Sequence, residues 1–149
     1  MAPQTARFQI QELDILELRV EKCYQNCIEL GEFLKSDDRV NSVCYPGLKS
    51  SKKYNLANKY FSGIPGTIMA FNLESQDACF KFMNKLQIIR RATNLNDNKS
   101  LIIHPYSNIY AEFSEKEREE MGIRDTMMRL SVGIENVDDL IEDIRQALS

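Results

Sequence analysis

The chain has 149 residues, 43% of them hydrophobic and 28% charged, and its formal net charge at pH 7 is −3. These values predict one globular domain with a core of its own. They argue against a nucleic-acid partner or an anionic membrane surface, which both favour a basic face. No apolar run approaches the roughly 20 residues that span a bilayer, and the first residues lack the features of a signal peptide, so we expect a cytoplasmic protein with no membrane partner.

The first predicted element is a helix over residues 3–34. Apolar residues recur there at spacings of three and four: Leu13, Leu16, Val20, Cys23, Cys27, Leu30 and Leu34. A helix of about 30 residues would be about 45 Å long. Its first half carries apolar residues on more than one face, which is typical of a helix that is covered on more than one side. We expect an exposed apolar patch along residues 8–20, where another domain or a second subunit would pack.

Strands and helices alternate after this helix. We expect strands over residues 40–45 and 67–73, and helices over residues 50–61 and 76–86, the second capped by Ser75. A short strand is predicted over 88–93, followed by a polar loop over 94–100. A further strand at 101–104 is stopped by Pro105.

The last third of the chain contains an irregular segment, two helices and one strand. The irregular segment covers residues 107–113. Ser114 and Glu117 match a capping box, so a helix is predicted over 115–121, and another over 137–148. Between them lies the strand that contains Arg129. The order of elements predicts one domain over residues 1–149, of the α/β (α+β) class, with a small, mostly antiparallel sheet of four to five strands and helices on one face.

Four cysteines and one histidine are the candidate metal ligands or nucleophiles. Cys23 and Cys27 would share a helix face, but the second close pair of a four-ligand zinc site is missing. We therefore expect core thiols and no metal site. His104, on an apolar strand, is expected to be structural. The acidic run at residues 115–120 is expected to be a solvated helix face.

Arg129 is the candidate binding residue. Strand periodicity places it opposite Met128 and Leu130, in an apolar segment. Its planar fork fits a carboxylate or phosphate. An intramolecular salt bridge, or a guanidinium in solvent, is the alternative, and the pattern alone favours that alternative. Arg129 and the 94–100 loop supply no base, nucleophile or electron sink, so these residues alone predict binding and not catalysis.

Five segments in the right order carry a resemblance to a known family. They are LDILELR at residues 13–19, VCYPGL at 43–48, SLIIHP at 100–105, RLSVGIE at 129–135, and DLIEDI followed by QAL within 139–148. Over residues 3–148 the chain resembles the C-terminal domain of the cysteine/methionine-metabolism family of pyridoxal-phosphate enzymes. The segment NLNDNKSL at residues 94–101 is most similar to O-acetylhomoserine sulfhydrylases, and the segment 65–71 would suit methionine gamma-lyase nearly as well.

The resemblance implies a function for Arg129. In such enzymes the matching arginine holds the substrate α-carboxylate and the residue matching Asn94 lies beside it, while pyridoxal phosphate serves as the electron sink. The implied reaction is γ-replacement of acetate by sulfide or a thiol, which gives homocysteine or methionine. The alternatives are a methionine gamma-lyase or cystathionine lyase/synthase domain, and a non-catalytic interaction domain that kept the fold.

The chain departs from the family pattern in several places. Gln11-Glu12 stands where the family usually has Arg-Gly, Asn96 replaces a loop glycine, and Tyr110 stands where sulfhydrylases usually have histidine. Asparagine tolerates the left-handed conformation that Asn96 would need. The family's cofactor domain, with its Schiff-base lysine, precedes the matched region. We therefore expect no bound pyridoxal phosphate and no catalysis by this chain alone, and a homo-oligomer for the full-length enzyme.

Overall fold

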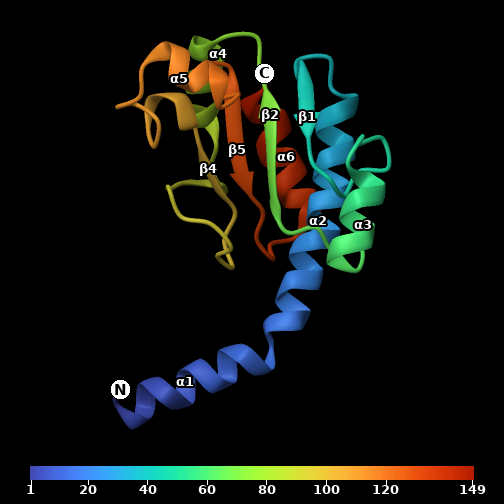
Figure 1. The fold of residues 1–149 in the computed structure, drawn as a ribbon, viewed down its shortest axis with the longest axis vertical. Coiled ribbons are helices and arrows are strands. Elements are labelled where there is room, and N and C mark those ends of the chain that lie inside the picture. The colour runs from blue at the N-terminus through green and yellow to red at the C-terminus, as the bar shows by residue number, and fades with distance from the viewer.

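Five strands form one sheet in the computed structural model of the chain, which describes all 149 residues. In spatial order they are β1 (Ser42–Cys44), β2 (Ile68–Asn72), β5 (Met127–Ser131), β4 (Leu101–Ile103) and β3 (Arg90–Arg91). Neighbouring strands are antiparallel except β3 and β4, which are parallel. The predicted fold class is confirmed, and β5, which carries Arg129, is the central strand (Figure 1).

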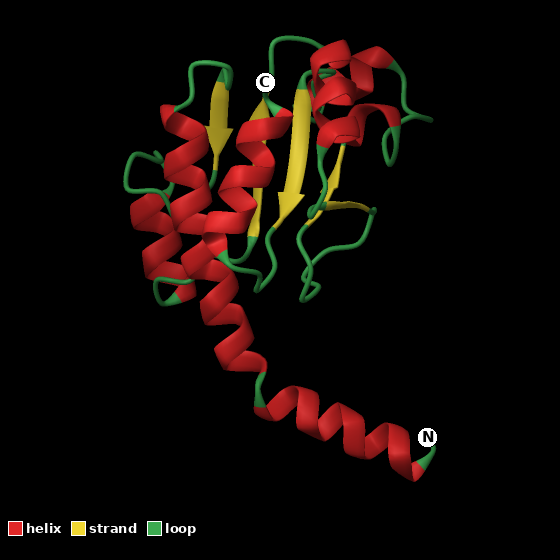
Figure 2. Cartoon of the chain, turned by 180° about the vertical axis from the view of Figure 1, so that it is seen from behind, coloured by secondary structure: helices red, strands yellow, loops and turns green.

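Helices cover one face of this sheet, in front of the strands in Figure 2. The main ones are α2 (Leu16–Ser36), α4 (Gln76–Lys85) and α6 (Val137–Ala147). Met128 and Leu130 of β5 are fully buried in the core cluster, which also contains Leu30 of α2, Phe82 of α4 and Leu140 of α6. Because strand side chains alternate, this packing directs Arg129 to the opposite face of the sheet.

The chain also has three shorter helices. Several elements are shorter than predicted. α3 (Tyr54–Phe61) begins four residues after the predicted start at residue 50. α5 (Glu115–Glu120) has the predicted capping box, and the 3-10 helix η1 (Pro105–Ser107) directly follows His104. The strand predicted over 40–45 is reduced to Ser42–Cys44, at the edge of the sheet.

The prediction of one continuous helix over residues 3–34 is wrong. α1 (Pro3–Asp14) and α2 are separate helices that meet at Ile15, whose φ and ψ angles are −107° and 5°. Figure 1 shows α1 leaving the body of the molecule at an angle to α2. The carbonyl oxygen of Glu12 accepts a hydrogen bond from Arg19 Nη2 at 3.2 Å, so a side chain bridges this elbow. No proline or glycine marks the bend, and the apolar spacing continues through it.

The predicted exposed apolar patch is present on α1 and the start of α2. α1 has no buried residue, and the exposed fractions of Phe8, Leu13 and Leu18 are 67%, 66% and 68%. Ile10, Ile15 and Leu16 are exposed as well. None of the helices combines the length and apolar character needed to cross a bilayer.

Candidate functional site

Arg129 lies in the middle of the central strand, on the face opposite the core. Its register partners are Ala70 of β2 and Ile103 of β4. The side chain is half-buried, and neither neighbour carries a charge that could neutralise it. The strand pairing therefore holds a cation at the centre of the sheet face that the main helices leave free.

Only one nitrogen of the Arg129 guanidinium donates hydrogen bonds to other groups of the chain. Nη2 donates to the carbonyl oxygen of Thr93 at 2.9 Å and lies 3.5 Å from that of Asn94. No carboxylate pairs with Arg129, and Nε and Nη1 donate to no group of the chain and are not buried. The alternative of an intramolecular salt bridge is therefore wrong. One side of the guanidinium fork is fixed and the rest can bind an anion.

Asn94 contacts Arg129 through its backbone carbonyl oxygen. Its side chain is exposed and makes no hydrogen bond within the chain. The two predicted site residues are thus brought together, with the carbonyl oxygens of Thr93 and Asn94 orienting the guanidinium and the amide of Asn94 open to a ligand.

The rest of the 94–100 loop is held by polar contacts to β5, to the turn that follows it and to the start of β2. The backbone N–H of Asn96 donates to Ser131 Oγ at 2.9 Å, and Asn96 Oδ1 accepts from Thr67 Oγ1 at 3.0 Å. Asn96 has a φ of 57°, as predicted for a residue in the place of a glycine. At the end of the loop, Glu135 accepts hydrogen bonds from the backbone and the hydroxyl of Ser100.

The turn after β5 has no room for a side chain at Gly133. A Cβ there would lie 2.4 Å from Glu135 Oε2 and 2.5 Å from the carbonyl oxygen of Asn98. The backbone N–H of Gly133 donates to Ser100 Oγ at 3.0 Å. This close approach joins the end of the loop to the strand that carries Arg129.

Asn26 is a site-supporting residue that the sequence reasoning missed. It is fully buried on α2, and its Nδ2 donates to the carbonyl oxygens of Gly133 and Glu135 at 2.9 and 2.8 Å. The available signal was a carboxamide within the apolar stripe of the helix. The hydrogen bonds between Ser100 and Glu135 were also not predicted, although the two residues lie in the segments at 100–105 and 129–135 that carry the family resemblance.

The cysteines and His104 do not form a reactive centre. No group of three or more metal-ligating side chains is found. Cys23, Cys27 and Cys79 are buried, and burial raises the pKa of each thiol, whereas Cys44 is exposed, which corrects the expectation of four core thiols. His104 is buried, and its ring nitrogens lie 2.8 Å from Ser107 Oγ and 2.6 Å from the carbonyl oxygen of Asp125, so it is structural as predicted. α5, which carries the acidic run, has no buried residue.

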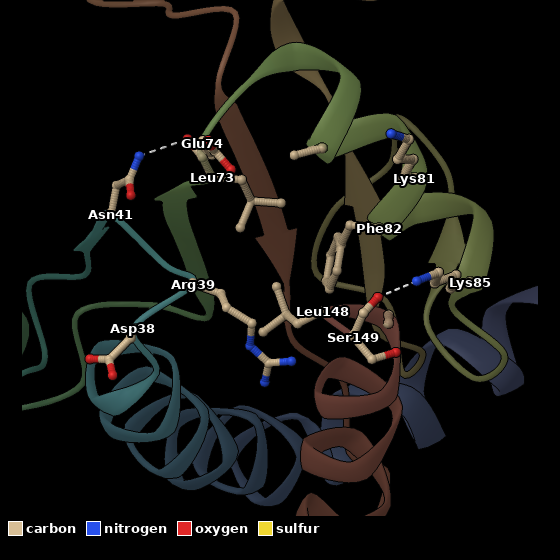
Figure 3. Close-up of a pocket in the computed structure, with 12 residues that line it drawn as sticks. Asp38, Arg39, Asn41, Leu73, Glu74, Lys81, Phe82, Lys85, Leu148 and Ser149 are labelled. Carbon is tan, nitrogen blue, oxygen red and sulfur yellow. Dashed lines mark hydrogen bonds between the residues drawn. The ribbon is translucent and has the colours of Figure 1, made fainter.

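Arg129 does not line the largest cavity. This cavity has a volume of about 560 Å³ and lies among the ends of α2, α4 and α6 (Figure 3). Its cations are already paired: Arg39 with Asp37, Lys81 with Asp77, and Lys85 with the backbone oxygen of Ser149. Arg39 and Lys81 therefore already have carboxylate partners, which Arg129 lacks.

Comparisons with known proteins agree with the resemblance. The family described as Cys/Met metabolism PLP-dependent enzyme (PLP is pyridoxal phosphate) matches residues 1–149. L-methionine gamma-lyase of Pseudomonas putida is 38% identical over 149 residues, which are 99% of this chain and 37% of that protein. O-acetyl-L-homoserine sulfhydrylase 1 of Thermus thermophilus is 35% identical over 138 residues, which are 92% of this chain and 33% of that protein.

Two solved structures have the same fold. The O-acetylhomoserine sulfhydrylase of Wolinella succinogenes is 41% identical with a TM-score of 0.84, and the match covers 100% of this chain and 39% of that one. A Campylobacter jejuni structure named for an O-acetylhomoserine (thiol)-lyase, which carries N'-pyridoxyl-lysine-5'-monophosphate, is 38% identical with a TM-score of 0.92. That match covers 99% of this chain and 35% of the other. The chain thus spans between a third and two-fifths of the length of these relatives.

Proposed function

Since the chain belongs to the Cys/Met metabolism family of pyridoxal-phosphate-dependent enzymes, we propose that residues 1–149 are the substrate-carboxylate-binding domain of such an enzyme. We propose further that its reaction is that of an O-acetylhomoserine sulfhydrylase, in which acetate at the γ-carbon is replaced by sulfide or a thiol. The observation that carries the proposal is the guanidinium of Arg129, which has no carboxylate partner in the chain.

The residues around Arg129 suit the carboxylate of an amino acid and not the cofactor. The groups that contact the guanidinium are the carbonyl oxygens of Thr93 and Asn94. Lys99 lies nearby in the sequence, but its side chain is exposed and makes no hydrogen bond. Only its backbone N–H takes part, by donating to Asp97. No lysine amine takes part in this network. We therefore assign the Schiff-base lysine to a part of the active enzyme outside residues 1–149, and no residue of this chain to the cofactor.

The proposed mechanism gives each residue of this chain a positioning role. Arg129 would bind the α-carboxylate through charge-assisted hydrogen bonds, with Nη2 held by Thr93. The amide of Asn94 would donate to the same carboxylate. Pyridoxal phosphate supplies the electron sink for loss of the γ-substituent when it is bound. A fixed carboxylate orients the reacting carbon, and such orientation is a large part of enzymatic rate enhancement.

The sulfhydrylase reaction is favoured by the 94–101 segment, whereas a methionine gamma-lyase is the second candidate. The P. putida lyase is as similar to this chain as the sulfhydrylases are. The two reactions differ in the fate of the substrate: replacement retains the amino-acid skeleton with new sulfur, whereas elimination releases methanethiol from methionine.

A chimera tests these alternatives. This chain would replace the matching third of the T. thermophilus sulfhydrylase, which supplies the remaining two thirds of the enzyme. We expect replacement of acetate by sulfide, and a fall in kcat/KM of about 100-fold on Arg129→Ala, since hydrogen bonds to charged groups are the strong ones. The matched control is Arg39→Ala, which breaks the Arg39–Asp37 ion pair elsewhere in the chain.

Three results would contradict the proposal in different ways. Methanethiol release from methionine without sulfide incorporation would favour the lyase. Full activity of Arg129→Ala would reject the carboxylate clamp. A folded chimera that binds pyridoxal phosphate and remains inactive would favour a non-catalytic domain. Independently, the isolated chain turning yellow with pyridoxal phosphate and cleaving O-acetylhomoserine would show that it is catalytic alone.

We also propose a covering partner for the exposed apolar side chains of α1 and the start of α2. Phe8, Leu13 and Leu18 would pack against the cofactor-bearing part of the enzyme or a second subunit. Sedimentation of the isolated chain at high concentration, together with binding of a hydrophobic dye, is the measurement. A monomer that binds no dye would count against this surface.

A further inference from the structure

Arg19 is a side chain that connects three separate segments. It lies in the first turns of α2, directly after the elbow at Ile15. Its Nη1 donates to Asn98 Oδ1 at 2.9 Å and lies 3.2 Å from Glu12 Oε2, while Nη2 donates to the Glu12 carbonyl oxygen at 3.2 Å. One guanidinium therefore contacts the end of α1 and the 94–100 loop from its place on α2.

This contact differs from the solvent-exposed ion pairs of the chain. Only 23% of the Arg19 side chain is exposed, and its Nε is buried. Asn98 lies 79 residues further along the chain. A surface ion pair contributes little, but a partly buried cation with three acceptors on two different segments restricts both of them.

The 94–100 loop needs such a contact because packing does not fix it against α2. A cavity of about 250 Å³ lies between α2 and the loop, lined by Val20 and Cys23 on one side and Asn96 and Asn98 on the other. The remaining anchors are on the sheet side, where the carbonyl oxygen of Asn98 accepts from the backbone N–H of Ile134 at 3.1 Å. The side chain of Asn98 has no hydrogen-bond partner other than Arg19.

We infer that Arg19 is a positioning residue for the carboxylate site. Through Asn98 it fixes the 94–100 loop, whose first residue Asn94 orients Arg129 together with the preceding Thr93. This rests on the proposed function of Arg129. Glu12 orients the Arg19 guanidinium from α1, so the position of α1 and the position of the carboxylate site are linked.

The test removes the acceptor in one set of variants, which leave Arg19 in place, and removes Arg19 itself in another. Asn98→Ala removes the hydrogen bond to the loop but keeps the Arg19–Glu12 pair, and Asn98→Asp restores an acceptor. Hydrogen exchange of the Ile134 amide in the 149-residue chain reports loop position without any ligand. We expect exchange at least about threefold faster in Asn98→Ala and Arg19→Ala, and near the native rate in Asn98→Asp, since an acceptor that meets a charged donor is regained.

Binding of the amino acid is the second measurement. Titration of the isotopically labelled chain with O-acetyl-L-homoserine, followed at the Arg129 Nε–H by NMR, gives the dissociation constant. We expect Asn98→Ala to raise it about three- to tenfold and Asn98→Asp to return it to within about twofold of the native value. Arg39→Ala, which breaks a separate ion pair, should change neither exchange nor affinity.

The outcomes separate this inference from the proposed function. If the native chain binds through Arg129 and Asn98→Ala matches it in exchange and affinity, the role of Arg19 is rejected and the clamp stands. If exchange changes as expected but Arg129→Ala binds as the native chain does, the clamp is rejected, and with it the role of Arg19 at that site. Failure of Asn98→Asp to recover either value would overturn the inference, because the loss would then not come from the missing acceptor.

Discussion

The carboxylate of Glu135 accepts two hydrogen bonds from Ser100: one from the backbone N–H at 2.7 Å and one from the hydroxyl at 3.0 Å. Ser100 is fully buried at the end of the polar loop, and Glu135 follows the turn after β5. The same hydroxyl accepts from the backbone N–H of Gly133. The two residues thus join the loop beside Arg129 to the end of the strand that carries it.

Glu135→Gln should destabilise the chain. An amide offers one oxygen in place of two, so the backbone N–H or the hydroxyl of Ser100 loses its acceptor in a buried position. We expect the free energy of unfolding to fall by about 1–3 kcal/mol, measured by urea denaturation. Glu142→Gln is the matched control, because Glu142 is exposed and pairs only with Arg145 on its own helix. Equal urea midpoints for the two variants would contradict the assignment.

Gly133→Ala should be more harmful than another Gly→Ala change in a buried position. At Gly133 the new Cβ would lie 2.5 and 2.6 Å from backbone atoms of Asn98 and Lys99, which cannot move without displacing the loop. We expect a loss of about 1–3 kcal/mol, as for overpacking. At Gly31 of α2, the Cβ would meet only the end of the Leu48 side chain, at 3.0–3.4 Å. Thermal unfolding of the two variants gives the comparison, and a smaller loss at Gly133 would reject it.

Local patterns in the sequence were sufficient for most of the fold. The alternation around Met128 and Leu130 predicted both the buried face of β5 and the free position of Arg129. Ser114 and Glu117 predicted the start of α5, which has the full capping box. These signals succeed because they depend on neighbours within one turn or one strand. The elbow at Ile15 has no such local signal, since its bridging contact comes from the Arg19 side chain.

The site was predictable only in part. Arg129 stood out because a cation in an apolar strand needs a partner, but its partners are backbone carbonyl oxygens 35 and 36 residues away. The contacts of Asn26 with the turn after β5 span 107 and 109 residues. Hydrogen bonds of that separation depend on the finished fold, and no periodicity in the sequence encodes them.

Asn96→Ala should cost more than Asn96→Gly. Asn96 has a φ of 57°, in the left-handed region, where a Cβ costs roughly 1–2 kcal/mol and glycine has no penalty. Both variants lose the contact of Asn96 Oδ1 with Thr67, so the difference between them isolates the backbone term. We expect Asn96→Gly to be more stable than Asn96→Ala by about 1 kcal/mol in urea. Equal stability would indicate that the loop relaxes out of this conformation.

The buried cysteines should make the chain less stable at alkaline pH. Burial raises the pKa of Cys79 to about 11, and Cys79 is fully buried. The thiol of an unfolded chain has a pKa of about 8.5. Above that pH the unfolded state releases the proton and the folded state retains it. The stabilisation is therefore complete below the unfolded pKa and is lost as the pH rises toward the folded one.

Cys79→Ser removes this group from the titration. We expect the loss of unfolding free energy between pH 8 and pH 10 to be about 1–2 kcal/mol smaller in the variant than in the native chain, because one thiol contributes at most about 1.4 kcal/mol per pH unit. Urea denaturation under reducing conditions gives the slope, so the cost of the substitution itself cancels. Burial also raises the pKa of Cys27, which should leave part of the alkaline loss in the variant. Cys44→Ser, at an exposed position, is the control. If the unfolding free energy of Cys79→Ser falls with pH as steeply as that of the native chain, ionisation of Cys79 does not cause the alkaline loss of stability.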